Sequence, residues 1–258
     1  MMSSSGSQFQ DFFMDDTYVL IKNDLYSYLL RKRAVGKALR DEKLQYVLEI
    51  GSGLSPLVSH GGLIVYTDLS LLALQILKSK GYRECFFLVA DCTNLPFKDR
   101  SFTQVVCSEV LEHVQDDQKA LQEMTRMLKP SGSLVLTFPH RRFYFSLDDR
   151  YVHHLRRYEL SEMLSCIGTA GLQPVLSWKV LGPLEKITML AAVSVYAWLK
   201  RSSLKPYKIT SKRTWPHIYV WIFRWFNRMY CVLARMDAII MPRFLSTVLL
   251  IKAVKPRK

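Results

Sequence analysis

The stretch VLEIGSGLSP, residues 47–56, decides the fold. It begins as an apolar strand and stops abruptly at Gly51-Ser52-Gly53. Glycine at the end of a strand permits a tight turn and lets a ligand approach without a Cβ in the way. Open parallel sheets bind their ligands beyond the carboxyl ends of the strands. The stretch therefore predicts a ligand-binding loop at such an edge.

The rest of the chain alternates apolar runs with amphipathic ones. This pattern predicts a three-layer α/β domain with a Rossmann-like, seven-stranded sheet and helices on both faces. Pro130-Ser131-Gly132 is expected to stop the second helix. The expected strands are 46–50, 63–68, 85–90, 104–108, 133–138, a run near 173–180 and 246–254, and the expected helices are 69–80, 116–129 and 159–171.

The same pattern divides the chain into four segments. The 15–40 stretch is expected to be helical and to pack across the mouth of the domain. A helical insertion is expected before the last strand. The segments are 1–40 (helical), 41–183 (the core), 184–245 (a basic amphipathic helical insertion) and 246–258 (the final strand and a basic tail).

Charge and cysteine usage bear on location. Residues 178–258 hold sixteen Lys or Arg and two acids, so the whole net charge of +14 lies in the last third. Such asymmetry indicates an anionic partner, either membrane or nucleic acid. The first residues have no secretory pattern, and five cysteines without C-x-x-C spacing favour a reducing compartment. We expect a cytoplasmic protein.

Three carboxylates mark successive strand ends, and they indicate the ligand. Glu49 precedes the glycines and would repel a pyrophosphate but attract an ammonium or sulfonium group. Asp68 ends the second strand, where it can accept hydrogen bonds from ribose hydroxyls, and Asp91 ends the third, within reach of an adenine amino group. The loop matches no phosphate-cradling pattern. The set suits a cationic nucleoside without phosphates, such as S-adenosylmethionine.

At these residues the chain resembles the class I S-adenosylmethionine-dependent methyltransferases, and in particular the quinone-biosynthesis branch. The motifs are VLEIGSG, VYTDLS, VADCTNLPFKDRSFTQVVCSEVLEHV and LKPSGSLVLTFP, within residues 46–140. The resemblance implies that Glu49 holds the methionine amino group and that Gly51 and Gly53 pass beneath the cofactor. Ser108 would lie near the methionyl moiety. Ser55 departs from the third glycine of many members.

For the nucleoside, the resemblance implies two further roles. Asp68 would bind the ribose. Asp91, with the backbone of Cys92, would bind the adenine.

The EVLEH motif raises the question of a metal. Glu109, Glu112 and His113 are spaced i, i+3 and i+4, which puts all three on one face of a helix. They could bind Mg²⁺ and lower the pKa of a substrate hydroxyl. The motif is similar to that of metal-using methyltransferases of ubiquinone synthesis and of small-RNA 2′-O-methylation. It also occurs in relatives without a metal, where Glu109 would cap the helix and His113 would pack beside the cofactor.

The segment HHLRRY, residues 153–158, lies where the family places its substrate loop. We expect His113 and His154 to be catalytic, because an imidazole titrates near neutrality and can act as a general base. His153 or His154 could instead complete the metal set as the histidine from a later loop. The two arginines that follow either bind a phosphate or carboxylate of the substrate or pair with Asp148, Asp149 and Glu159 to order the loop. The sequence leaves both readings open.

The insertion contains an aromatic, basic helix over 215–241. Thr214 can be its N-cap, Pro216 suits the first turn and Pro242 marks its end. The longest uncharged run of the insertion, 187–199, has thirteen residues, too few to span a bilayer. A helix lying in an anionic membrane interface fits best. The alternatives are a cap on the sheet, a dimer contact or an RNA surface.

Together these features predict an S-adenosylmethionine-dependent methyltransferase, peripheral at the membrane. Its acceptor would be a small, amphiphilic or lipid-linked molecule, and nucleic acid is not the expected partner. Two alternatives stay open. One is a metal-dependent RNA 2′-O-methyltransferase, and the other is a non-catalytic module that binds the cofactor. The oligomeric state is not predicted.

Overall fold

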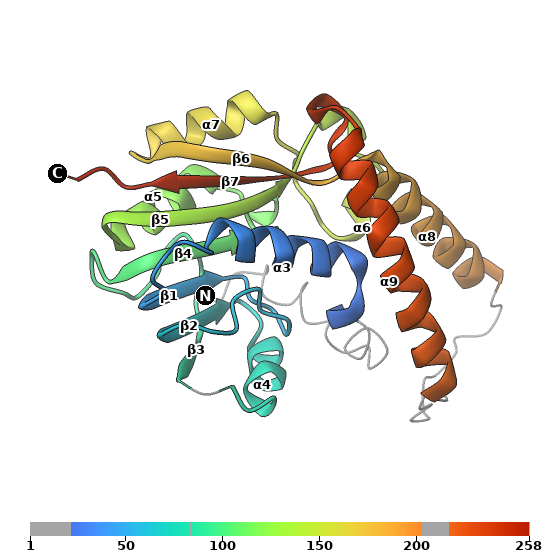
Figure 1. Ribbon diagram of the computed structural model, residues 1–258, viewed down its shortest axis with the longest axis horizontal. Coiled ribbons are helices and arrows are strands. Elements are labelled where there is room, and N and C mark those ends of the chain that lie inside the picture. The colour runs from blue at the N-terminus through green and yellow to red at the C-terminus, as the bar shows by residue number, and fades with distance from the viewer. Residues whose placement is uncertain (1–21, 83, 203–216, 258) are drawn as a thin grey trace.

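A computed structural model describes residues 22–82, 84–202 and 217–257 (Figure 1). Within them, seven strands form one sheet in the order β3-β2-β1-β4-β5-β7-β6. Strands β1 to β5 are parallel, and β7 is antiparallel to both of its neighbours, β5 and β6. The strands are β1 (Tyr46–Ile50), β2 (Leu63–Asp68), β3 (Cys85–Val89), β4 (Phe102–Ser108), β5 (Leu128–Pro139), β6 (Gln173–Leu181) and β7 (Val248–Val254).

Helices cover both faces of the sheet, as the alternating pattern predicts. The longer helices are α3 (Tyr26–Ala38), α4 (Leu71–Ser79), α5 (Asp117–Met127), α7 (Leu160–Thr169), α8 (Pro183–Ser202) and α9 (His217–Ile240). Short helical turns are η2 (Lys22–Asp24), η3 (Leu111–His113), η4 (Arg142–Tyr144), α6 (Leu147–Tyr151) and η5 (Arg243–Leu245). The three-layer fold is confirmed.

The core consists of one apolar layer on each face of the sheet. Helices α5 and α7 pack on one layer through residues such as Met124 and Met163. Helices α3, α4 and α9 pack on the other, through residues such as Val35, Leu74 and Ala234. Strand residues on both faces are buried because helices cover both. Helix α3 therefore lies along a face of the sheet and not only across its mouth (Figure 1); residues 15–21 lie outside the described residues.

The crossover from β1 to β2 contains no helix, since residues 51–62 form a loop throughout. Gly51 has a φ of +67°, and a Cβ there would lie 2.3 Å from Val110 Cγ2. A side chain at this position would be strained by the backbone and would collide with its neighbour. The tight loop expected from the glycines is present, and Leu54, Leu57 and Val58 anchor it in the core.

Two adjoining expected boundaries were wrong: the end of the second helix, and the start of the fifth strand, which was expected at residue 133. The second helix was expected to run to residue 129 and stop at Pro130-Ser131-Gly132, but α5 ends at Met127 and β5 already begins at Leu128. Leu128 pairs with Phe102 of β4, and Ser131 donates its N–H to the carbonyl of Lys255. Pairing with β4 thus begins before Pro130, and the proline also disfavours a helical conformation in the residue that precedes it.

The helical insertion before the last strand is confirmed. Helices α8 and α9 lie between β6 and β7 in the chain and next to each other in space (Figure 1). Helix α9 packs on α3 and β6. It ends at Ile240, two residues before Pro242; Thr214 and Pro216 lie outside the described residues.

Candidate active site at the carboxyl edge

The two acids at the ends of β1 and β2 hold the glycine loop. Glu49 is buried, and its carboxylate accepts hydrogen bonds from the N–H groups of Leu57 and Val58 at 2.7 and 3.0 Å. Asp68 accepts from the N–H groups of Gly53 and Ser70, both at 2.8 Å. The loop is therefore preorganised by carboxylates at the edge where a ligand would bind.

Burial changes the acidity of both carboxyls. Removal from water disfavours the charged form and raises the pKa of Glu49 to about 7, although its two N–H donors oppose the shift. Burial also raises the pKa of Asp68, again against N–H donors. A cation beside either group would restore its charge, so both carboxyls are suited to a positively charged ligand.

The other predicted cofactor residues lie at the same edge. Asp91 follows β3, and its carboxylate accepts from the N–H and the hydroxyl of Thr93, both at 2.8 Å. Cys92 is buried beside it. Ser108 ends β4, and its hydroxyl lies 2.7 Å from that of Thr137 on β5. Because β1 to β4 are parallel, all of these positions gather at one edge of the sheet.

Residues 109–113 do not form the helix that the spacing of EVLEH predicts. Glu109 has a φ of +54°, and only the short turn η3 follows it. The Glu109 carboxylate lies 3.4 Å from Arg31 and accepts a hydrogen bond from Thr137 at 3.1 Å. Glu109 therefore stays near Glu112 but is not among the ligand atoms that converge with those of Glu112 and His113, with which it was expected to share a metal. The helical expectation was wrong because a positive φ at Glu109 is not a helical conformation.

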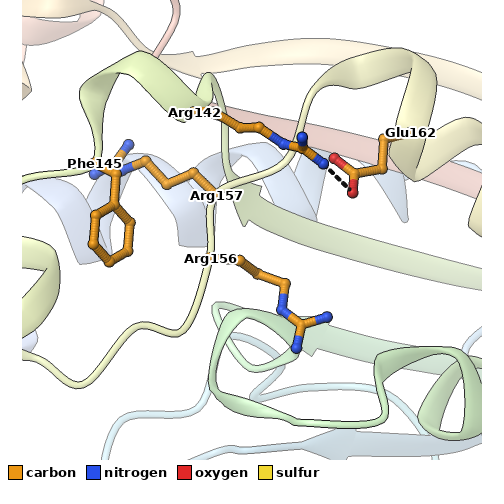
Figure 2. A pocket seen from close by; sticks show the side chains of 5 residues that line it. All are labelled: Arg142, Phe145, Arg156, Arg157 and Glu162. Carbon is orange, nitrogen blue, oxygen red and sulfur yellow. Dashed lines mark hydrogen bonds and ion pairs between the residues drawn. The ribbon is translucent and has the colours of Figure 1, made fainter.

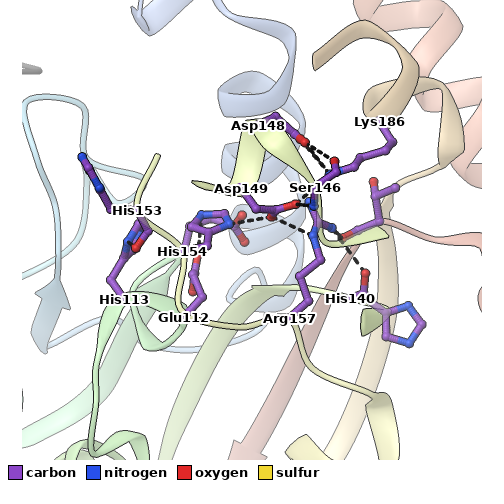
Figure 3. Close-up of polar contacts among 12 residues, drawn as sticks. Glu112, His113, His140, Ser146, Asp148, Asp149, His153, His154, Arg157 and Lys186 are labelled. Carbon is purple, nitrogen blue, oxygen red and sulfur yellow. Dashed lines mark hydrogen bonds and ion pairs between the residues drawn. The ribbon is translucent and has the colours of Figure 1, made fainter. Parts of the chain in front are cut away.

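A different trio comes together at this edge (Figure 3). Glu112, His113 and His154 each offer one ligand atom, and these atoms lie within 4.8 Å of one another. The Glu112 carboxyl is fully buried, and neither of its oxygens has a hydrogen-bond partner among the described residues. Burial and the neighbouring Glu109 raise its pKa well above the ordinary value. A buried carboxyl without a donor is costly, so it points to a proton or a ligand at this position.

The two imidazoles have defined hydrogen bonds. Nδ1 of His154 lies 2.8 Å from the Asp149 carboxylate, which fixes the proton on Nδ1 and leaves Nε2 as the basic atom, 3.7 Å from Glu112. Nδ1 of His113 lies 3.2 Å from the carbonyl of His153. Burial, and then His154, lower the pKa of His113 to about 4, so His113 is neutral at physiological pH. His153 contacts His113 through its backbone carbonyl, and its imidazole is not one of the three ligand groups.

A buried ionic cluster stands behind His154, and sequence reasoning missed its key member. Lys186 of α8 contacts the carboxylates of Asp148 and Asp149, each at 2.7 Å. Arg157 donates to Asp149 at the same distance. Burial alone would raise the pKa of Asp149, but the His154 hydrogen bond and the two cations hold it below its ordinary value. One lysine within an apolar helix gave no signal that it would reach this site.

The two arginines of the substrate loop form ion pairs within the chain, which fits the expectation that they order the loop better than the expectation that they bind an anion. Arg157 is buried against Asp149, and Arg156 contacts Asp117 at 3.1 Å. Both line a pocket of about 360 Å³ with Phe145, Arg142 and Glu162 (Figure 2). Within that pocket Arg142 pairs with Glu162 at 2.7 Å. The partner of Arg156 is Asp117 and not one of the three expected acids.

Residues 48–136 match the family model described as a methyltransferase domain. Over these residues the chain is similar to the methyltransferase-domain family. Its strand order and the glycine loop at the end of β1 agree with this assignment. The matched region runs from β1 into β5, so the cofactor edge lies inside it, whereas α3, His154, α8 and α9 lie outside.

Curated relatives of the methyltransferase domain cover part of the chain. The demethylmenaquinone methyltransferase of Streptomyces griseus subsp. griseus is 34% identical over 111 residues, which is 42% of this chain and 48% of that protein. The norajmaline N-methyltransferase of Rauvolfia serpentina is 32% identical over 128 residues, 42% of this chain and 44% of that one. The chain thus spans about half the length of the curated relatives it matches.

Solved structures extend the likeness in fold to the flanks. A chain of the complex between the Haloferax volcanii Trm112 methyltransferase activator and a methyltransferase has a TM-score of 0.64 at 18% identity, covering 99% of both chains. Phosphoethanolamine N-methyltransferase 2 of Haemonchus contortus, in complex with S-adenosyl-L-methionine, has a TM-score of 0.55 at 17% identity, over 88% of this chain and 52% of that one. At these identities the similarity shows the fold of the methyltransferase domain.

Proposed function

We propose that this chain transfers the methyl group of S-adenosylmethionine to a small amphiphilic acceptor. The observation that carries the proposal is the glycine loop, which Glu49 and Asp68 hold at the ends of two adjacent strands. Both carboxyls have oxygen lone pairs beyond those used by the loop. Neither the loop nor its acids suit a phosphate, and both suit a sulfonium nucleoside.

The cofactor would lie along this edge with its parts against successive strands. Its ammonium would ionise Glu49, and its ribose hydroxyls would donate to Asp68. The adenine would meet Asp91 and the backbone of Cys92. Ser108, at the end of β4, would lie nearest the methionyl chain. The methyl group would then point toward the segment after β4, where the trio of Glu112, His113 and His154 lies.

The chemistry would be an in-line displacement at the methyl carbon. The acceptor atom supplies the electron pair for the new bond, and the bond to sulfur breaks with its electrons left on S-adenosylhomocysteine. The leaving group is already activated, so the chain's main contribution is to position the reactants. Nε2 of His154 can take the acceptor's proton, because Asp149 holds the other ring nitrogen protonated. Neutral His113 lies next to it, with ring centroids 4.8 Å apart.

The amphiphilic class of acceptor is supported by the apolar, basic α9 surface that follows the substrate loop. Among the curated relatives, the demethylmenaquinone methyltransferases are named for a quinone acceptor. For this chain we propose an amphiphilic acceptor of the same general kind, without proposing that it is the same quinone. A peripheral position at a membrane follows from the same proposal, since such acceptors reside in bilayers.

A two-step experiment tests the proposal. Calorimetry should show S-adenosylhomocysteine binding to the purified chain, with weaker binding in Asp68→Asn. The chain, a membrane lipid extract and S-adenosylmethionine bearing a deuterated methyl group should then yield a labelled lipid by mass spectrometry. His154→Ala should keep cofactor binding and lose labelling. Binding of NADH or ATP in place of S-adenosylhomocysteine would refute the cofactor assignment, and cofactor binding without any labelled product would favour a non-catalytic module.

The trio supports one alternative, a metal-dependent methyltransferase such as an RNA 2′-O-methyltransferase. One carboxylate and two imidazoles suit Mn²⁺ or Zn²⁺ better than Mg²⁺, which prefers oxygen ligands. Glu112, His113 and His154 would hold the ion, and it would lower the pKa of an acceptor hydroxyl. Mn²⁺ binding that Glu112→Gln abolishes, together with salt-sensitive binding of RNA, would favour this alternative.

A further inference from the structure

The outward face of α9 is apolar along the whole described length of the helix. Ten of its apolar side chains are between 38% and 67% exposed, whereas Asn227, Ala234 and Ala238 on the opposite face are buried. Such a wide apolar face, with nothing packed against it among the described residues, is typical of an interaction surface. The ten residues, which we call the α9 face, are Trp221, Ile222, Trp225, Phe226, Met229, Val232, Leu233, Met236, Ile239 and Ile240.

Positive charge borders the α9 face on one flank. At about 100° per residue, Arg224, Arg228 and Arg235 fall in one stripe beside it. Arg224 contacts Asp24 at 2.8 Å, and all three arginines are exposed. The acid of α9, Asp237, turns inward and accepts a hydrogen bond from the N–H of Leu184 at 3.0 Å. The outward side of the helix therefore combines apolar surface with positive charge.

We infer that the α9 face binds the surface of an anionic lipid bilayer. An amphipathic helix with arginines on its polar flank and tryptophans on its apolar face is suited to the boundary between headgroups and acyl chains. Twenty-four residues give a helix about 36 Å long, which lies flat along that boundary. No helix among the described residues is long and apolar enough to cross a membrane.

Charge favours a bilayer over a second copy of the chain. Arg224, Arg228 and Arg235 flank the α9 face, whereas Asp237, the acid of the helix, accepts a hydrogen bond from Leu184 on the inner side. A symmetric dimer through the α9 face would bring two such arginine flanks together, and like charges repel. Anionic headgroups instead neutralise them, at about 1 kcal/mol for each basic residue near the surface.

The docked helix would bring the proposed acceptor site to the membrane. Helix α8 contacts α9 and also supplies Lys186, which binds Asp149 beside His154. Helix α8 thus links α9 to the proposed base (Figures 1 and 3). This consequence rests on the proposed function, whereas bilayer binding itself does not.

Vesicle sedimentation of the full chain tests the inference. The protein should bind vesicles of equal parts phosphatidylcholine and phosphatidylglycerol, and should bind pure phosphatidylcholine more weakly. Phe226→Glu should lower the partition coefficient about tenfold or more, because it inserts a charge into the apolar face. Phe86→Glu on β3 is the matched control, since Phe86 is 59% exposed and Phe226 61%; it should bind within about twofold of the unmodified chain. Arg228→Gln should weaken binding about fivefold on anionic vesicles.

Three outcomes would overturn the inference. The first is that the unmodified chain remains in the supernatant with anionic vesicles at low salt. Phe226→Glu and Phe86→Glu could bind equally well. Light scattering could show a dimer that Phe226→Glu dissociates without any vesicle binding. S-adenosylhomocysteine calorimetry on the same variants distinguishes failure of the bilayer inference from failure of the proposed function. Cofactor binding should be unchanged in each variant.

Discussion

The buried carboxyl of Glu49 makes the proposed cofactor binding depend on pH. Its pKa is raised to about 7, and the ligand's ammonium requires the ionised form. Acidification should therefore weaken S-adenosylhomocysteine binding within a range where the folded chain can be handled. The ligand's ammonium stays protonated over that range, so the change reports on the protein.

The magnitude follows from the ionised fraction. With a pKa of about 7, Glu49 is about three-quarters ionised at pH 7.5 and about 3% ionised at pH 5.5. The apparent dissociation constant scales with the inverse of the competent fraction, so it should rise about 25-fold, or about 1.9 kcal/mol. Glu49→Gln should bind roughly 10- to 150-fold more weakly at pH 7.5, the value for a lost hydrogen bond to a charged group, and its affinity should be independent of pH.

The same carboxyl should affect stability with the opposite sign. The folded-state pKa of about 7 lies above the ordinary value of 4.5, so the folded chain binds this proton more tightly than the unfolded chain does. The resulting stabilisation is complete below pH 4.5 and is lost as pH rises to 7, by about 3 kcal/mol. The difference in unfolding free energy between the unmodified chain and Glu49→Gln isolates this contribution.

Isothermal titration calorimetry at several pH values measures the binding prediction. Glu112→Gln is the control, because Glu112 is also a buried carboxyl with a raised pKa but lies in the proposed acceptor site. It should keep the 25-fold pH dependence of the unmodified chain. A dissociation constant that is flat from pH 7.5 to 5.5, or the same slope in Glu49→Gln, would show that Glu49 does not meet the ligand's ammonium.

Two further predictions concern the buried ionic cluster. Lys186→Met should destabilise the fold by about 3–5 kcal/mol, lowering Tm by about 6–20 °C, because it leaves buried Asp148 without its cation and Asp149 with only Arg157. Arg142→Gln, which breaks the exposed pair with Glu162, should cost less than about 1 kcal/mol, and equal effects in denaturant titrations would contradict this. Asp149→Asn should mix the tautomers of His154, and an unchanged ¹⁵N NMR pattern would rule out that orienting role.

The sequence predicted the sheet well because each strand is a short apolar run bounded by turn residues. Strands β1, β2 and β3 agree with the expected runs to within one residue. The expectation failed where local and tertiary preferences disagree. The amphipathic pattern of 116–129 continues beyond Met127, but pairing of Leu128 with β4 ends the helix earlier. Spacing within one segment contains no information about a partner strand.

The site was predictable to the extent that it depends on strand ends. Glu49 and Asp68 lie at the edge where their positions in the sequence put them. The sequence offered Glu109, Glu112 and His113 as metal ligands, with His153 or His154 as an addition. Glu112, His113 and His154 do come together, whereas Glu109 adopts a positive φ and turns toward Arg31. Asp149 was considered only as a partner for the arginines, and its contact with His154 needed the fold.

The division of the chain explains why its relatives indicate the reaction better than the acceptor. The matched region, residues 48–136, contains the glycine loop and the strand-end acids, so similarity there concerns the cofactor. The proposed base His154 and its supporting Asp149 lie after that region, and Lys186 reaches them from the insertion. Acceptor choice would therefore depend on residues for which the curated alignments offer little guidance. If the matched region determines cofactor binding and the later residues determine the acceptor, exchanging residues 137–254 for those of a relative should change the acceptor. Cofactor affinity should stay the same.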